Sequence, residues 1–285
     1  MAKKSGAVEN VLEFDLDAIR AREAAVMEES DESILERLGE RFRILNDMTQ
    51  AVKSGDVRAM IVSGPPGVGK SYGVEAVLQK AGLFDTLAEK KPKYEIVKGA
   101  MSSIGLYKKL YEFAKAGNVV VFDDCDGVLM DELSLNILKG ALDSSARRFI
   151  AWNTDSRILR HEGIPDRFEF CGSAIFITNI KFEHVRSKKL RDHLNALESR
   201  CHYIDLQMDT TREKLLWINK MVTDNEMLAR YEFEPVTKAE IIEFIEENKD
   251  RLRELSLRMV LKIADLKKSF PVGWQAMVKT TCMRR

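Results

Sequence analysis

One stretch near the start of the chain has the residue types and spacing of a phosphate-binding loop. Residues 61–71 read Ile-Val-Ser-Gly-Pro-Pro-Gly-Val-Gly-Lys-Ser, and Gly64 to Ser71 match G-x-x-x-x-G-K-[ST]. The glycines permit a tight turn whose backbone N–H groups converge on phosphate oxygens. Lys70 places a cation on the β- and γ-phosphates, and the Ser71 hydroxyl can ligate Mg²⁺. The stretch predicts a site for a nucleoside triphosphate with Mg²⁺.

The flanking segments are those that such a loop requires. The apolar run 59–62 predicts a strand, and residues 71–80 have a helical pattern with Val74, Val77 and Leu78 on one side. The phosphates would therefore lie at a helix N-terminus. The residues expected to bind the nucleotide here are Gly64, Pro65, Gly67, Val68, Gly69, Lys70, Ser71 and Tyr72.

A second stretch, residues 119–124, ends an apolar run with two acids and has the pattern of a Walker B strand. A carboxylate at the end of a strand can hold Mg²⁺, and the next one can orient and polarise the attacking water. We assign Asp123 to Mg²⁺, together with Ser71, and Asp124 to the water.

Composition indicates an ordinary soluble protein. Of 285 residues, 45% are apolar and 32% charged, and Lys plus Arg equals Asp plus Glu at 45 each. The net charge of zero gives no overall attraction to nucleic acid or membrane, although a local basic groove is still possible. The four cysteines lack C-x-x-C spacing, which favours neither zinc nor disulfides. No signal peptide or membrane-length run is evident, so we expect a cytoplasmic protein that contacts no membrane.

Strands alternate with helical segments up to about residue 208, which predicts an α/β fold with a five-stranded parallel sheet flanked by helices. Further strands are expected near residues 94–97, 119–123, 174–178 and 202–206, and helices near 34–52, 106–116, 132–142 and 187–197. After that the pattern is all-helical, with helices opening at Thr210, at Thr237 (as a capping box with Glu240) and at Ser256. We expect an N-terminal extension over 1–32 that is partly helical or disordered, an α/β nucleotide-binding domain over 33–208 and a small helical lid over 209–285.

Together these features resemble the AAA+ ATPases over about residues 34 to 268. Thr178-Asn179, at the end of the fourth strand, resembles sensor 1, whose polar side chain positions water near the γ-phosphate. Residues 199–201, Ser-Arg-Cys, resemble the stretch of clamp-loader-type subunits in which the arginine, here Arg200, reaches the neighbouring subunit's nucleotide. Leu255–Met259 resembles sensor 2, which would bring Arg258 to the nucleotide. The sequence as a whole also resembles small AAA+ proteins encoded by bacteriophages. This resemblance would place the protein in the cytoplasm of a bacterial host.

The resemblance implies ATP and Mg²⁺ as cofactors and a homo-oligomer, a ring or spiral often of six subunits. Asp124, Asn179 and Arg200 would be the catalytic residues. The family normally has Glu as the second Walker B acid, whereas Asp124 is one methylene shorter. Assistance from Asp126, and slow hydrolysis, therefore both stay open.

The substrate is less determined. Residues 143–173 form a long connection in which two aromatic runs could pair as a hairpin, similar to the channel hairpin of AAA+ helicases and initiators. Arg157, Arg160 and Arg167, with Trp152 and Phe168, would suit single-stranded DNA. The alternative is that the aromatic residues Phe149, Trp152, Phe168 and Phe170 belong to the core.

A second channel candidate, residues 98–107, lacks the aromatic-hydrophobic-glycine tip of protein unfoldases, although Met101 or Tyr107 could substitute. We therefore favour a helicase, loader or remodeller acting on single-stranded or duplex DNA in replication or recombination. The alternatives are an ATP-driven protein remodeller, which would have a protein partner, and a slowly hydrolysing, nucleotide-switched scaffold.

Overall fold

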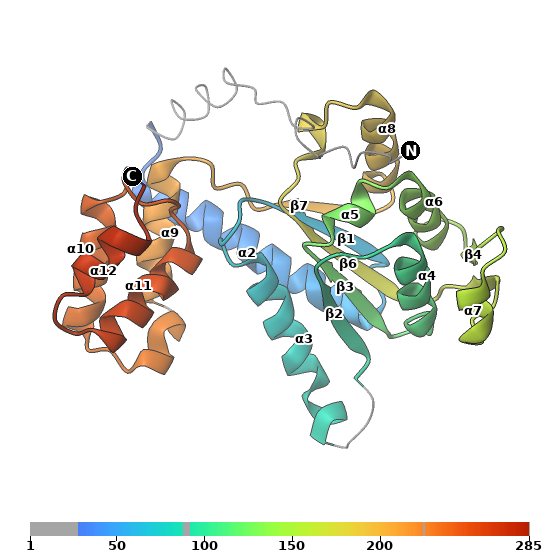
Figure 1. Cartoon of the computed structure of the whole chain (residues 1–285), viewed down its shortest axis with the longest axis horizontal. Helices are drawn as coiled ribbons and strands as arrows, with labels where there is room; N and C mark the ends of the chain where they lie inside the picture. Colours follow the sequence, from blue (N-terminus) through green and yellow to red (C-terminus); the bar gives the residue numbers. More distant parts are fainter. Residues whose placement is uncertain (1–27, 88–91, 225, 285) are drawn as a thin grey trace, which may run out of the picture. The chain divides into compact units, whose positions relative to one another are not determined.

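The computed structural model describes residues 28–87, 92–224 and 226–284. The chain forms two compact units (Figure 1). Of the described residues, one unit comprises Arg43–Gly64 and Lys70–Asp205, and the other comprises 28–42, Pro65–Gly69 and Leu206 onwards. Most of the predicted extension, residues 1–32, lies outside the described residues. The predicted domain boundaries stay a prediction.

The first unit is built on the predicted five-stranded sheet, and all of its strand pairs are parallel. The order of the strands is β2-β3-β6-β1-β7. Strands β1, β3 and β6 are buried along their whole length, which explains their continuous apolar sequence. The bounds are β1 Ala59–Ser63, β2 Tyr94–Lys98, β3 Val119–Asp123, β6 Ser173–Thr178 and β7 His202–Asp205.

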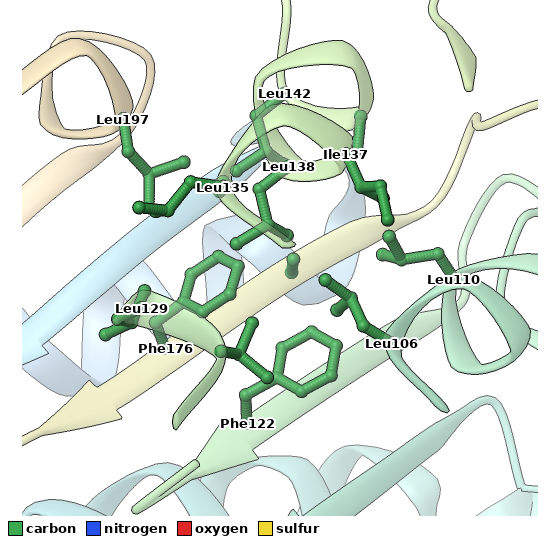
Figure 2. Close-up of a cluster of buried hydrophobic side chains, with 14 of the residues drawn as sticks. Leu106, Leu110, Phe122, Leu129, Leu135, Ile137, Leu138, Leu142, Phe176 and Leu197 are labelled. Carbon is green, nitrogen blue, oxygen red and sulfur yellow. The ribbon is translucent and has the colours of Figure 1, made fainter. Parts of the chain in front are cut away.

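One face of the sheet packs against helices α4 (Ser103–Glu112), α6 (Glu132–Ala141) and α8 (Lys188–Glu198). Figure 2 shows Phe122 of β3 and Phe176 of β6 directed toward the leucines of these helices. Their rings stack at 5.2 Å between centroids. Serine side chains, Ser102 and Ser187, cap the N-termini of α4 and α8.

Alternate residues of the same strands point to the opposite face. In this unit that side contains α3 (Lys70–Leu87) and the second half of α2 (Asp31–Ser54). The two helices approach closely at Gly73, where an added Cβ would lie 3.2 Å from Leu45 Cδ2. The helix predicted over 71–80 is α3, which begins at Lys70, immediately after the glycine loop, and is longer than predicted.

The long connection before β6 contains the predicted hairpin. Strands β4 (Phe149–Ala151) and β5 (Arg167–Glu169) pair antiparallel, with Ile150 opposite Phe168. A short helix, α7 (Arg157–His161), lies between them and is capped by Ser156. The other short elements of this unit are α5 (Asp126–Leu129) and the 3₁₀ turn η1 (Phe182–His184).

The second unit is helical and has its own apolar core. Thr210 and Glu213 form a capping box at the start of α9, as expected of a helix opening there. The capping box predicted at Thr237 is wrong, because α10 already begins at Pro235, whose fixed φ suits the first turn. No described helix is long and apolar enough to cross a membrane. The elements are α9 Thr211–Thr223, η2 Glu226–Tyr231, α10 Pro235–Glu247, α11 Leu257–Ser269 and α12 Trp274–Thr281.

Candidate nucleotide-binding site

The register of the sheet brings the predicted polar residues to one edge. Ser63 pairs with Thr178, and Asp123 pairs with Ile177, so strands β1, β3 and β6 end at the same level. Parallel sheets bind their ligands at this carboxyl edge. The phosphate loop follows β1, the two acids end β3 and Asn179 follows β6. The topology therefore converts three separate sequence signals into one site.

The loop leaves β1 at Gly64 and enters α3 at Lys70. Gly67 and Gly69 have φ angles of 72° and 112°, in a region that L side chains rarely adopt. The glycine spacing of the motif therefore meets a real requirement of the backbone. The predicted sequence of strand, loop and helix is confirmed.

Lys70 lies at the centre of the site and is only 5% exposed. Its ammonium group donates to the Gly64 carbonyl (2.6 Å) and to Oδ1 of Asn179 (2.7 Å). The structure thus brings together the loop lysine and the residue predicted as sensor 1, although 109 positions separate them in the sequence.

The predicted Mg²⁺ residues also lie side by side. Ser71 Oγ donates to Oδ1 of Asp123 at 2.8 Å, and Asp123 is 4% exposed. A hydroxyl and a carboxylate are the oxygen ligands that Mg²⁺ takes alongside nucleotide phosphates, so the donor set fits. Lys98 at the end of β2 lies 3.5 Å from Asp123 Oδ2. The sequence indicates Lys98 only as the start of a candidate channel loop; its pairing with Asp123 in the sheet register places it beside the predicted Mg²⁺ residues.

Asp124 adopts a left-handed conformation with φ of 53°, which Asp tolerates better than most residues. Its backbone N–H donates to the Ile177 carbonyl at 3.0 Å, and its exposed carboxylate accepts from Nδ2 of Asn179 at 3.0 Å. Asn179 therefore bridges Lys70 and Asp124 through the two ends of its amide. This geometry suits an acid that orients a water molecule beside a phosphate.

Asp126 is engaged in a different way. Its carboxylate accepts from the Thr178 hydroxyl at 2.6 Å, and burial raises its pKa above the usual range. The hydrogen bond and the charge of Lys70 oppose that shift, and the charge of Asp124 adds to it. The contact with Thr178 was not predicted. In the sequence, the contact is indicated only by the presence of a third acid, Asp126, in the run Asp-Asp-Cys-Asp over 123–126.

Residues Pro65–Gly69 of the loop pack within the helical unit. The Leu257 N–H donates to the Gly67 carbonyl at 2.8 Å, and Trp217 Nε1 donates to the Val68 carbonyl at 3.2 Å. A Cβ on Gly67 would lie 2.7 Å from the Cβ of Ser256, the N-cap of α11. Carbonyls of a phosphate loop face away from the phosphates, so these bonds support the loop from behind.

The remaining predicted nucleotide contacts differ in availability. The Val68 side chain is 3% exposed and belongs to the core of the helical unit, which leaves its backbone for a nucleotide. Tyr72 is 74% exposed on α3. Arg258 is exposed at the start of α11, with its Cβ 3.5 Å from the Cβ position of Gly67. Binding of nucleotide by Tyr72 and Arg258 stays a prediction.

Trp217 provides a direct test of the support behind the loop. Its indole is 5% exposed and stacks on Phe42 at 4.4 Å. Trp217→Phe should preserve the stack and remove the donor to Val68. We expect a loss of about 1 kcal/mol, or a Kd for ATP about fivefold higher by fluorescence titration. Trp274→Phe is the matched control, because Trp274 is equally buried but packs against Phe244. Equal effects of the two substitutions would contradict this role.

Arg200 lies just before β7, at the amino ends of the strands, whereas the phosphate loop lies at their carboxyl ends. Its Nη1 donates to the Ala196 carbonyl at 2.5 Å, at the end of α8. Because β1 spans about 13 Å between the two edges, Arg200 is remote from the Lys70 of its own chain. Arg200 therefore takes no part in the site around Lys70 within one chain, and its role as a catalytic residue stays a prediction.

The hairpin aromatics divide into two groups. Phe168 is 9% exposed and packs edge-on against Tyr107 at 5.1 Å, Trp152 packs against the same tyrosine at 5.6 Å, and Phe170 is fully buried. Phe168 and Phe170 are core residues and Trp152 is half-buried against that core, so Phe168 and the packed face of Trp152 are not available to stack with bases. Phe149 is 38% exposed instead. The guanidinium groups of Arg147 and Arg167 lie over its ring at 5.0 and 4.5 Å.

Fold and site together define a P-loop nucleotide-binding protein, and comparison with known proteins refines this class. The family model described as "ATPase family associated with various cellular activities (AAA)" matches residues 60–155. A protein of Enterobacteria phage T4, described as an uncharacterized 36.7 kDa protein in the nrdC-mobD intergenic region, is 32% identical over 265 residues. That match covers 92% of this chain and 79% of the phage protein. The chain belongs to the AAA+ ATPase family.

A crystal structure of a DNA replication initiation factor is similar over 84% of this chain, with a TM-score of 0.41 and 12% identity. The chain spans 62% of the length of that structure.

Proposed function

We propose that this protein binds and hydrolyses ATP at the subunit interfaces of a homo-oligomeric ring, and that hydrolysis drives remodelling or translocation in DNA replication or recombination. The observation that carries the ATPase proposal is the continuous contact from Lys70 through Asn179 to Asp124. Beside it lies the pair of Ser71 and Asp123. The residues that this chain itself would use to hold the γ-phosphate and its attacking water therefore lie together at the carboxyl ends of the strands.

Each residue has a distinct part in the proposed reaction. Bound Mg²⁺ would neutralise phosphate charge, with Ser71 and Asp123 holding it. Lys70 stabilises the negative charge on the transferred phosphoryl oxygens. Asp124 accepts a hydrogen bond from the attacking water and takes its proton, while the Asn179 amide keeps that carboxylate in position.

The ring proposal is supported by the position of Arg200 at the far edge of the sheet. From there its guanidinium would approach the γ-phosphate held by the neighbouring subunit, as the family resemblance implies. Within the isolated chain it caps the end of α8. Loss of phosphate would then alter the grip between subunits, a rigid-body switch.

The DNA proposal is supported by the half-exposed ring of Phe149 with the guanidinium groups of Arg147 and Arg167 over it; Arg147 also pairs with Glu169. An aromatic ring with flanking cations can stack a base and neutralise the backbone beside it. Arg157 and Arg160 on α7 extend this basic surface, and Arg160 also pairs with Asp155. Phe149 thus takes the role that Trp152 and Phe168 were expected to have.

The test is steady-state ATPase activity with and without single-stranded DNA at two salt concentrations. We expect stimulation by DNA that falls steeply as salt rises, because backbone contacts release counterions. Phe149→Ala should raise the DNA concentration for half-maximal stimulation about tenfold and leave the basal rate unchanged. Leu133→Ala is the control, since Leu133 is an exposed apolar residue of the same unit, on α6. Activity indifferent to DNA would overturn the DNA proposal.

Two observations bear on the alternatives. Tyr107 is fully buried and its hydroxyl donates to the Pro165 carbonyl at 2.9 Å, so it cannot grip a polypeptide in a channel. This disfavours a protein unfoldase. The Asp124 side chain, one methylene shorter than the Glu that the family normally has, favours slow turnover. A nucleotide-switched scaffold is therefore the second candidate, and ATP-dependent assembly with slow hydrolysis would support it.

We further propose that a bacteriophage encodes the protein and that it acts in the cytoplasm of a bacterial host. The similarity to the T4 protein over 92% of this chain supports the origin.

A further inference from the structure

A pocket of about 530 Å³ lies at the edge of the sheet where β1 and β7 begin, opposite the phosphate loop. Two arginines line it, Arg58 immediately before β1 and Arg200 just before β7. Met60 of β1 pairs with His202 of β7 in the parallel register. Arg58 lies two residues before Met60, and Arg200 lies two residues before His202. Parallel strands preserve such offsets, so the two arginines are brought together by the sheet itself.

Arg58 is fixed in this position at both ends. Its carbonyl accepts from the Ala174 N–H at 3.0 Å. Its Nη1 donates to the carbonyls of Asp143 and Ser145 at 3.0 and 3.1 Å. Nε and Nη2 form no hydrogen bond with any residue that the structure describes. They remain available to a ligand, in the fork geometry that suits a phosphoryl group.

Positive charge predominates in the lining of the pocket, although the carboxylate of Asp143 close by is attracted to Arg200. Within the described ranges, neither Arg58 nor Arg200 forms an ion pair, and Arg200 Nε is buried without a hydrogen-bond partner. Asp56 is the one carboxylate in the lining, and it accepts from the Ser54 hydroxyl at 2.6 Å. His202 and the hydroxyl residues Ser144 and Ser199 complete the polar lining. Two guanidinium groups with unused donors favour an oxyanion that carries more than one charge.

We propose that Arg58 is a second arginine acting in trans, which contacts the terminal phosphoryl group of the ATP held by a neighbouring copy of this chain. This inference rests on the proposed function, because Arg200 is assigned to the same phosphoryl group there. Because Arg58 and Arg200 line the same pocket, a neighbouring subunit's nucleotide that contacts Arg200 also lies beside Arg58. The pocket is thus a two-arginine site that completes the active site of the next subunit.

The first experiment separates binding from turnover in Arg58→Ala, Arg200→Ala and the double variant. We expect Kd for ATP to stay within about twofold of wild type, since each chain keeps its own loop. We expect kcat to fall about 100-fold for Arg58→Ala and about 1,000-fold for Arg200→Ala. The double variant should fall little below Arg200→Ala, because residues acting as a unit are not additive. Arg58→Lys should recover only part of the rate, since it keeps the charge and loses the fork.

Arg43→Ala is the matched control, because Arg43 is an exposed arginine of the same unit that pairs with Asp47. It should hydrolyse ATP at the wild-type rate. An Arg58→Ala protein that folds, as judged by its melting temperature, and turns over ATP as Arg43→Ala does would overturn the inference. The inference would also be overturned if Arg58→Ala kept its kcat but bound DNA at least about fivefold more weakly. That result would mean that Arg58 contacts a phosphate of a nucleic-acid backbone.

The second experiment mixes variants in equal amounts. Arg58→Ala lacks the proposed arginine and keeps an intact loop, whereas Lys70→Ala lacks the loop lysine and keeps both arginines. If Arg58 acts in trans, the mixture regains activity that neither variant has alone. Arg200→Ala mixed with Lys70→Ala should regain activity in the same way. Recovery with Arg200→Ala but not with Arg58→Ala would overturn this inference alone. Recovery with neither would overturn the interface site of the proposed function as well.

Discussion

Replacing Lys70 with alanine should abolish ATP binding. The ammonium group is nearly buried, and its contacts with the Gly64 carbonyl and Asn179 fix it at the centre of the site. A charge-assisted contact with phosphate oxygens contributes about 3 kcal/mol, so Kd should rise at least about 100-fold. Isothermal titration calorimetry with ATP and Mg²⁺ measures this directly.

Lys70→Met separates loss of charge from loss of packing. Methionine keeps an unbranched apolar side chain in the buried space and removes the cation. We expect Lys70→Met to melt close to the wild-type temperature and to bind ATP as poorly as Lys70→Ala. Wild-type affinity in Lys70→Met would show that the phosphates lie elsewhere.

Asp124→Asn should keep ATP binding and lose hydrolysis. Asn tolerates the left-handed conformation at φ of 53° as well as Asp does, so the turn after β3 should be preserved. The amide cannot take a proton from water, so kcat should fall at least about 100-fold. Kd for ATP should change by less than about twofold, since Asp124 is exposed and Lys70 and Ser71 are untouched.

Asp126→Asn is the companion variant that locates the catalytic acid. Asp126 is half-buried and its carboxylate already accepts from the Thr178 hydroxyl, so it is less accessible to a water molecule than the exposed Asp124. We expect Asp126→Asn to retain most of the wild-type kcat. A collapse of kcat in Asp126→Asn with normal turnover in Asp124→Asn would reverse the two assignments.

The sheet and the centre of the site could be predicted because each depends on local patterns. Buried parallel strands read as continuous apolar runs, and the polar residues that follow β1, β3 and β6 must meet at their common edge. The contacts of Lys70 with Asn179 and of Ser71 with Asp123 follow from that convergence. The family resemblance added the roles of these residues.

Other features depend on packing that no local pattern encodes. Period-2 spacing could not show that Phe168 and Phe170 face the core while Phe149 stays exposed, because both kinds of position carry aromatic residues. The donor from Trp217 to Val68 joins residues 149 positions apart and has no motif. Arg58 belongs to no sequence motif, and only the sheet order, which places β1 beside β7, brings it near Arg200.

The central claim is that one chain's nucleotide is hydrolysed with an arginine from another chain. The most direct measurement is the rate of ATP hydrolysis per subunit as protein concentration is raised from well below to well above the level at which the chain assembles. Our account predicts a rate that rises with assembly and then reaches a plateau, and an Arg200→Ala protein that assembles without that rise. A rate per subunit that is constant across the range, and equal in Arg200→Ala, would contradict it.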